Sequence, residues 1–281
     1  MDWAKWKRPS TYLCYLLLLI LVIFLVFPVF WVLVTSLKTD AQTFAIPLIF
    51  WPRPATLQNY VDVFSGGELL TYMKNSLIIA IPSVVISLFF AICAAYGFAR
   101  FTFPGSRAAL SSILLLRMIP GIMFYIPYFL MITGMGLLNT HTGVIICMIP
   151  GNTLFATWIL QGFFRTVPVE IEEAAEIDGL GVLRRLLLIV LLVSAPAIVT
   201  AMLFTFLGSW NEYLLSSTLL RDSALFTMPM GIEKFSSAVN ERIYWGKIMA
   251  NAAFYLLPVL IFTFVSQKGL VSGLSAGAVK A

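Results

Sequence analysis

The sequence predicts an all-α membrane protein with six transmembrane helices and a cytoplasmic helix between the fourth and the fifth. Hydrophobic residues make up 60% of the chain and charged residues only 11%, and the mean hydropathy is +0.95. Soluble domains contain roughly 45–50% apolar residues. A helix satisfies its own backbone hydrogen bonds in hydrocarbon, and the period-two alternation of a β-barrel is absent. The apolar segments should therefore be helices that cross a membrane.

Six apolar stretches approach or exceed the roughly 20 residues that a helix needs to cross a bilayer. They run from Tyr12 to Leu37, between Lys74 and Arg100, from Ala108 to Met135, from Thr142 to Phe164, from Ser194 to Leu220 and from Ile248 to Gln267. A signal peptide is the alternative for the first stretch, but its apolar run is too long and no small-residue cleavage site follows. We interpret it as a retained helix in a single domain over residues 1–281.

Lysine and arginine in the loops set the orientation. With both termini inside, ten of these residues fall in short cytoplasmic segments and seven in longer outer loops. The inner residues are Lys5, Lys7, Arg8, Arg100, Arg107, Arg165, Arg184, Arg185, Lys268 and Lys280; the outer ones are Lys38, Arg53, Lys74, Arg221, Lys234, Arg242 and Lys247. This bias predicts cytoplasmic termini and places EEAAEIDGLG in the cytoplasm.

The stretch EEAAEIDGLG is unusually acidic for this chain, with carboxylates at Glu172, Glu173, Glu176 and Asp178. Pro168 suits the first turn of a helix, which should run from Pro168 to Asp178. Its spacing gives two faces: a small face with Ile171, Ala174, Ala175 and Asp178, and an acidic face with Glu172, Glu173 and Glu176. Gly179 then permits a turn into GVLRRLLLIVLLV. The residues alone suit a docking site for a partner and a solvated surface helix equally well.

The spacing of Glu173, Ala174, Ala175, Gly179, Ile189 and Leu191 closely resembles the membrane-spanning subunits of bacterial ATP-binding-cassette importers. Their signature is Glu-Ala-Ala, three residues, Gly, nine residues and Ile-x-Leu-Pro. Leu192 stands where the family has proline, and Pro196 could supply the break in its place. GSWNEYLLSSTLL, YGFARFTFPG and GLSAGAVKA further resemble the carbohydrate-importer permeases of the maltose-transporter type.

The resemblance implies a sugar or oligosaccharide importer in the bacterial cytoplasmic (inner) membrane. This chain would form half of the translocation path and pair with a second, different permease. A cytoplasmic ATPase dimer and an extracytoplasmic substrate-binding protein would complete the system, whereas scattered basic residues give no reason to expect nucleic acid. The chain has no G-x-x-x-x-G-K-[ST] loop, so ATP and Mg should be bound by the partner ATPase, with no cofactor or catalytic residue in this chain.

The same resemblance assigns roles at the cytoplasmic side. Residues 168–193 would form the coupling segment and residues 269–281 a C-terminal tail that reaches the ATPase. The residues expected to contact the ATPase are Glu173, Ala174, Ala175, Asp178 and Gly179 in the coupling segment, and Ser275, Gly277 and Lys280 in the tail. Bulk at Ala175 or Gly179 should prevent the close approach of the partner.

Four residues are candidates for the substrate path: Arg117, Asn211, Glu212 and Tyr213. Ionisable residues at membrane depth are rare unless they face a cavity or a partner. Arg117 has two interpretations, a structural ion pair with Glu212 or attraction of an acidic saccharide such as a uronic-acid oligomer. The other three form either a structural hydrogen-bonding hub or part of the path lining.

Other functions remain as alternatives at this point. A secondary transporter would also be polytopic, although no clear internal repeat is present. An importer of a non-carbohydrate solute would share the coupling motif. A membrane-embedded enzyme or a metal site has poor support, because the single histidine, His141, has no companion at ligand spacing. Cys14, Cys93 and Cys147 lie in apolar stretches and are interpreted as small hydrophobes.

Overall fold

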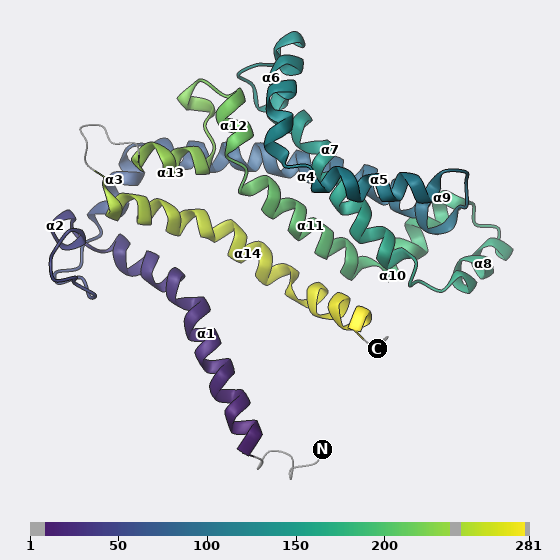
Figure 1. Ribbon diagram of the computed structural model, residues 1–281, viewed down its shortest axis with the longest axis horizontal. Coiled ribbons are helices and arrows are strands. Elements are labelled where there is room, and N and C mark those ends of the chain that lie inside the picture. Colours follow the sequence, from purple (N-terminus) through teal and green to yellow (C-terminus); the bar gives the residue numbers. More distant parts are fainter. Residues whose placement is uncertain (1–8, 237–242, 279–281) are drawn as a thin grey trace. The chain divides into compact units, whose positions relative to one another are not determined.

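The computed structural model describes residues 9–236 and 243–278, and these residues form helices joined by loops, with no strand among them (Figure 1). The elements are α1 (Pro9–Ser36), α2 (Asp40–Thr43), α3 (Gln58–Ser65), α4 (Glu68–Arg100), α5 (Ser106–Met118), the 3-10 helix η2 (Gly121–Phe124), α6 (Tyr125–Gly134), α7 (His141–Phe164), α8 (Val169–Ile177), α9 (Val182–Arg185), the π-helical turn η3 (Leu186–Val190), α10 (Leu191–Val193), α11 (Ala195–Trp210), α12 (Leu214–Leu219), the 3-10 helix η4 (Ser223–Leu225), α13 (Met228–Ser236) and α14 (Trp245–Ala278). The predicted all-α class is confirmed.

Within residues 9–236 and 243–278, four helices are long and apolar enough to cross a membrane: α1, α4, α7 and α14. The candidate span in α1, Thr11–Ser36, is the most apolar of them, with a mean hydropathy of 3.3. Its side chains from Tyr12 to Phe27 are mostly half exposed or more, as expected for a helix that faces lipid or another chain. The first, second, fourth and sixth predicted stretches thus coincide with single long helices.

The third and fifth predicted stretches are broken instead of being continuous helices. Ser106–Met118 and Gly121–Gly134 meet at 96° around Pro120, which forces Ile119 into an extended conformation. Val182–Val193 and Ala195–Trp210 meet at 82° around Ser194. Counting each bent pair as one span gives up to six spans in the described ranges, and the predicted number of six stays a prediction.

The described residues divide into two compact units. The first contains the chain up to Leu69 together with Ile232–Leu256, and the second contains Leu70–Gly231 and the chain from Leu257. One boundary between the units falls within α4 and another within α14. This division does not test the predicted single domain, which stays a prediction.

The first unit is held together by polar contacts around α3. Asn59 Nδ2 donates to the carbonyl oxygens of Ser36 and Lys38, at 2.8 Å each, and so fixes the end of α1. Lys247 pairs with Asp62 at 2.9 Å, which joins the start of α14 to α3.

The core of the second unit is apolar and lies where α4, α6, α7, α12 and α13 meet. Its buried members are Ile79, Ile132, Val144, Cys147, Met148, Leu215, Leu219, Leu220 and Met230. The helix α7 also packs against α5 and α11. Asn75 on α4 donates to the carbonyls of Ala224 and Phe226 at 2.8 and 3.0 Å, and His141 Nε2 lies 3.0 Å from the carbonyl of Leu225. The single histidine thus contacts the backbone of the η4 region.

Candidate functional site

The helix predicted over Pro168–Asp178 is present as α8, Val169–Ile177, within one residue of each expected end, and its cytoplasmic location stays a prediction. Pro168 precedes it at the N-cap position. At the other end Gly179 has a φ of +84°, which a residue with a side chain rarely adopts. The amide of Leu180 donates to the carbonyl of Ala175 and that of Gly179 to the carbonyl of Glu176, at 3.0 and 2.9 Å. This is a Schellman ending, and the predicted turn at Gly179 is confirmed.

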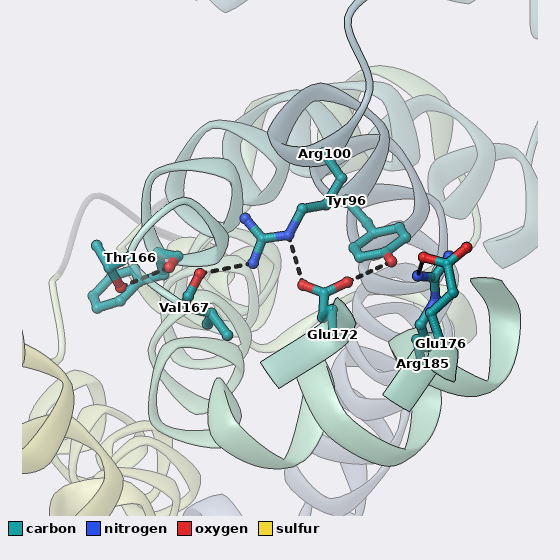
Figure 2. A network of polar contacts seen from close by, with 8 residues as sticks. Tyr96, Arg100, Thr166, Val167, Glu172, Glu176 and Arg185 are labelled. Atoms are coloured by element: carbon teal, nitrogen blue, oxygen red, sulfur yellow. Dashed lines mark hydrogen bonds and ion pairs between the residues drawn. The ribbon is translucent and has the colours of Figure 1, made fainter. Parts of the chain in front are cut away.

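The carboxylate of Glu172 is buried, which corrects the expectation that it lies on an exposed acidic face. It accepts a 2.7 Å hydrogen bond from the hydroxyl of Tyr96 and a 2.6 Å bond from Nε of Arg100. Both partners belong to the last turns of α4, and the side chains of Arg100 and Glu172 are only 9% and 5% exposed. Figure 2 shows the carboxylate between these two partners. A buried carboxylate needs such partners, because an unpaired charge is costly to remove from water.

The two faces of α8 therefore differ from the predicted faces. Glu172 and Ala175 point into the chain, and Ala175 is only 7% exposed. The other predicted coupling residues are exposed: Glu173, Ala174, Asp178 and Gly179. Ile177, which the prediction left out, is 87% exposed. A partner can thus reach Ala174 and Gly179 directly, whereas added bulk at Ala175 would disturb this chain's own packing.

The segment after α8 returns toward the apolar helices in two steps. Arg185 on α9 forms an ion pair with Glu176 on α8, also visible in Figure 2. The chain then bends at Ser194, before Pro196, which lies in the first turn of α11. Pro196 has no N–H to donate to the carbonyl four residues earlier, that of Leu192. The break expected from Pro196 in place of the missing motif proline is present.

A cavity of about 550 Å³ lies in the second unit, beside the break between α5 and α6. Its polar lining comes from Arg117, Tyr125, Tyr128, Asn152 and Glu212. Apolar side chains and three glycines, Gly121, Gly151 and Gly208, complete the wall. Irregular backbone at membrane depth is tolerated where it borders a cavity, so the break at Pro120 fits this position.

Arg117 is exposed within this chain and lines the cavity. Its guanidinium carbon lies 4.4 Å from the ring centroid of Phe155, a cation–π contact. Arg117 and Glu212 are both described residues, and they form no ion pair within 4.0 Å. The structural interpretation of Arg117 as the partner of Glu212 is therefore wrong for this structure.

Glu212 has both of the predicted roles, as a hydrogen-bonding residue and as part of the cavity lining. Its carboxylate accepts bonds from the amides of Leu215 and Ser216 at 2.6 and 2.9 Å and from the Ser216 hydroxyl at 2.7 Å. These bonds cap the start of α12, where the N–H groups lack helical partners. Glu212 also lines the cavity, whereas its neighbours Asn211 and Tyr213 are not among the lining residues. Tyr213 packs against the apolar core.

Three cavity residues were not singled out from the sequence: Tyr125, Tyr128 and Asn152. The two tyrosines are three positions apart and so share one face of α6. Asn152 donates to the hydroxyl of Ser209 at 2.9 Å, which orients its amide. The sequence signal that could have found Asn152 is the Pro-Gly-Asn interruption inside an apolar span.

The predicted tail residues lie at the limit of the structure. The backbone of α14 continues as far as Ala278, so Ser275 and Gly277 belong to a helix whose side chains are not described there. Lys280 lies outside the described residues. Their predicted contact with an ATPase stays a prediction.

Comparison with known proteins decides the family. Residues 87–275, which contain α8 and all the polar cavity residues, match the family described as the inner membrane component of binding-protein-dependent transport systems. The chain belongs to this family. It is accordingly a multi-pass inner membrane permease subunit of a transporter and not an enzyme.

Individual relatives span most of the chain. It is 32% identical to the inner membrane ABC transporter permease protein YcjP of Escherichia coli strain K12, with 89% of both chains covered. It is 33% identical to the trehalose/maltose transport system permease protein MalG of Thermococcus litoralis, covering 89% of this chain and 90% of that one. Among solved structures, a bacterial ABC transporter involved in the import of the acidic polysaccharide alginate has a TM-score of 0.79 at 23% identity, covering 95% of this chain and 99% of that one. That likeness establishes the fold.

Proposed function

We propose that this permease forms half of the translocation path of an ATP-driven importer of oligosaccharides, and that the substrate is acidic. The observation that carries the proposal is the cavity beside the α5–α6 break, where a cation, two tyrosines, an amide and a carboxylate converge. The relatives named as trehalose, maltose and maltodextrin permeases support a sugar as the substrate class.

The chemistry of the cavity suits a saccharide. Tyrosine rings can pack against the apolar faces of sugar rings, and their hydroxyls can bond to sugar hydroxyls. The amide of Asn152 adds donor and acceptor groups. The guanidinium of Arg117 is exposed and forms no ion pair with another described residue. It can bind a sugar carboxylate through two parallel hydrogen bonds. A neutral sugar would make no use of this charge.

The energy for transport comes from a separate ATPase dimer, which binds ATP and Mg. Its contact on this chain is the exposed surface of α8, formed by Glu173, Ala174, Asp178 and Gly179 together with Ile177. Small residues at Ala174 and Gly179 allow close approach, and an apolar side chain as exposed as Ile177 favours burial against a partner. A second, different permease supplies the other half of the path, and an extracytoplasmic binding protein delivers the sugar. Both termini, including residues 269–281, lie in the cytoplasm.

The decisive experiment is uptake by the complete complex in proteoliposomes. We expect accumulation of a uronic-acid oligosaccharide to require ATP and the binding protein, and to persist without a proton or sodium gradient. Uptake driven by an ion gradient alone would establish a secondary transporter instead. ATP-driven uptake restricted to neutral sugars or to a non-carbohydrate solute would overturn the acidic-saccharide assignment.

A matched pair of variants tests the coupling surface. Ala174→Trp should detach the ATPase or abolish its stimulation by the loaded binding protein, because the indole occupies the space of the partner. Ala174→Ser keeps the residue small and should behave as the wild type. Normal stimulated ATPase activity and uptake in Ala174→Trp would remove α8 as the contact.

A further inference from the structure

The carboxylate of Glu172 on α8 accepts bonds from two side chains of α4. We propose that Tyr96, Arg100 and Glu172 form a clamp that makes α8 move as one body with α4. Through this clamp, α4 transmits the movement of the ATPase from α8 to the transport cavity. The proposal rests on the proposed ATP-driven function. It assigns positioning roles to three residues that lie outside the expected coupling surface.

The clamp is a buried ion pair with an additional hydrogen bond from a tyrosine. Both carboxylate oxygens of Glu172 are used, one by Tyr96 and the other by Arg100. Nη2 of Arg100 also donates at 2.9 Å to the carbonyl of Val167, in the link between α7 and α8. One guanidinium thus holds both the start of α8 and the chain leading into it (Figure 2). Arg100 lies in the last turn of α4 and Glu172 in the first turn of α8, where the helix dipoles favour their charges.

The far end of α8 is also fixed. Its Schellman ending and the Arg185–Glu176 ion pair join α8 to α9. Glu172 and Glu176 therefore lie between Arg100 on one side and Arg185 on the other. The helix has little freedom to tilt by itself, because breaking the buried pair would leave an uncompensated charge. Movement of α8 should displace the end of α4.

The helix α4 connects this clamp to the cavity wall. One face of α4 contacts α7 through Ser83, whose hydroxyl lies 3.9 Å from the sulfur of Met148, and through Ser87, whose hydroxyl donates at 3.3 Å to the carbonyl of Ile149. Met148 and Pro150, on either side of Ile149, line the cavity. From Ser83 to Arg100 the helix extends about 25 Å at 1.5 Å per residue. A displacement at α8 thus reaches the cavity through one continuous helix.

Spin-label distances test whether α4 and α8 form one body. In the complete complex, with Cys14 changed to Ser, one label is placed on the exposed Cys93 of α4 and one on Val169→Cys of α8, which is exposed and lies outside the proposed ATPase contact. We expect a narrow distance distribution that is the same in the nucleotide-free and ATP-trapped states. A reference pair, Trp158→Cys on α7 with Val169→Cys on α8 in a Cys93→Ser background, should change its distance between the states. A change in the α4–α8 distance as large as that of the reference pair would overturn the proposal.

Function gives the second measurement. Glu172→Gln should broaden the α4–α8 distances and raise the ATP hydrolysed per sugar imported, because removal of one charge from a buried ion pair weakens the link between the two helices. Glu170→Gln, which changes an exposed carboxylate of the same turn, should leave both quantities unchanged. If Glu172→Gln does not assemble, Tyr96→Phe keeps the ion pair and should give an intermediate broadening. Narrow distances and a normal ATP-to-sugar ratio in an assembled Glu172→Gln complex would refute the clamp.

The outcomes distinguish this proposal from the proposed function. If the chain were not part of an ATP-driven importer, no labelled pair would respond to ATP. If only the clamp were wrong, the reference pair would still respond and the α4–α8 pair would respond with it.

Discussion

Replacement of Arg117 by glutamine tests the substrate chemistry of the cavity most directly. The side chain is exposed and its contact in the structure is the 4.4 Å approach to the ring of Phe155. An exposed cation–π contact contributes about 0.5–1 kcal/mol, so Arg117→Gln should lower the thermal stability of the protein only slightly. Loss of a hydrogen bond to a charged group costs about 1.5–3 kcal/mol, which corresponds to roughly 10- to 150-fold in affinity.

The assay compares two substrates of equal length in proteoliposomes that contain the complete complex, one a uronic-acid oligosaccharide and the other its neutral counterpart. Transport of the acidic sugar should lose about 10- to 150-fold in kcat/KM in Arg117→Gln, and transport of the neutral sugar should change by less than about fivefold, the equivalent of 1 kcal/mol. Arg117→Lys should recover part of the loss, because it keeps the charge but not the planar fork. An equal loss for both sugars, or none, would refute the acidic site. A large fall in thermal stability that Glu212→Gln reverses would instead revive the structural pair.

Two other predictions concern packing and assembly. Gly143→Ala on α7 should destabilise the protein by about 1–3 kcal/mol in thermal unfolding, because its Cβ would lie 2.6 Å from the carbonyl oxygen of Leu137. The control is Gly162→Ala on the same helix, where nothing lies within 4 Å of the added Cβ. Equal stability of the two variants would contradict the packing argument. Deletion of Ser275–Ala281 should weaken co-purification of the ATPase or its stimulation, while unchanged co-purification and activity would exclude the tail as a contact.

The long spans and α8 could be predicted because their signals are local. Apolar runs as long as those of α1, α4, α7 and α14 identify membrane helices by composition, and Pro168 and Gly179 determine the two ends of α8 through backbone geometry. The break at Pro120 could have been predicted from the same kind of local signal, because a proline disfavours helical backbone in the residue before it. It was overlooked because the apolar run continues on both sides and hydropathy does not detect a bend.

The site was less predictable because it depends on contacts between distant segments. Periodicity placed Glu172 on an exposed face, but it cannot reveal that Arg100, 72 positions earlier, lies within 2.6 Å. Arg117 and Glu212 were found because charges at membrane depth are rare. Tyr125 and Tyr128 were not found, since aromatic residues are ordinary in apolar helices and only the fold brings these two to the cavity.

The double use of Glu212 has a consequence for how such a transporter can change its substrate over evolutionary time. Its carboxylate both lines the cavity and caps α12, so a substitution that altered the ligand chemistry there would also release the three bonds at the start of that helix. Arg117 does not cap a helix in this way, because its side chain is exposed and makes no ion pair among the described residues. New specificities should therefore arise by exchange at position 117, while position 212 is kept constant as part of the scaffold.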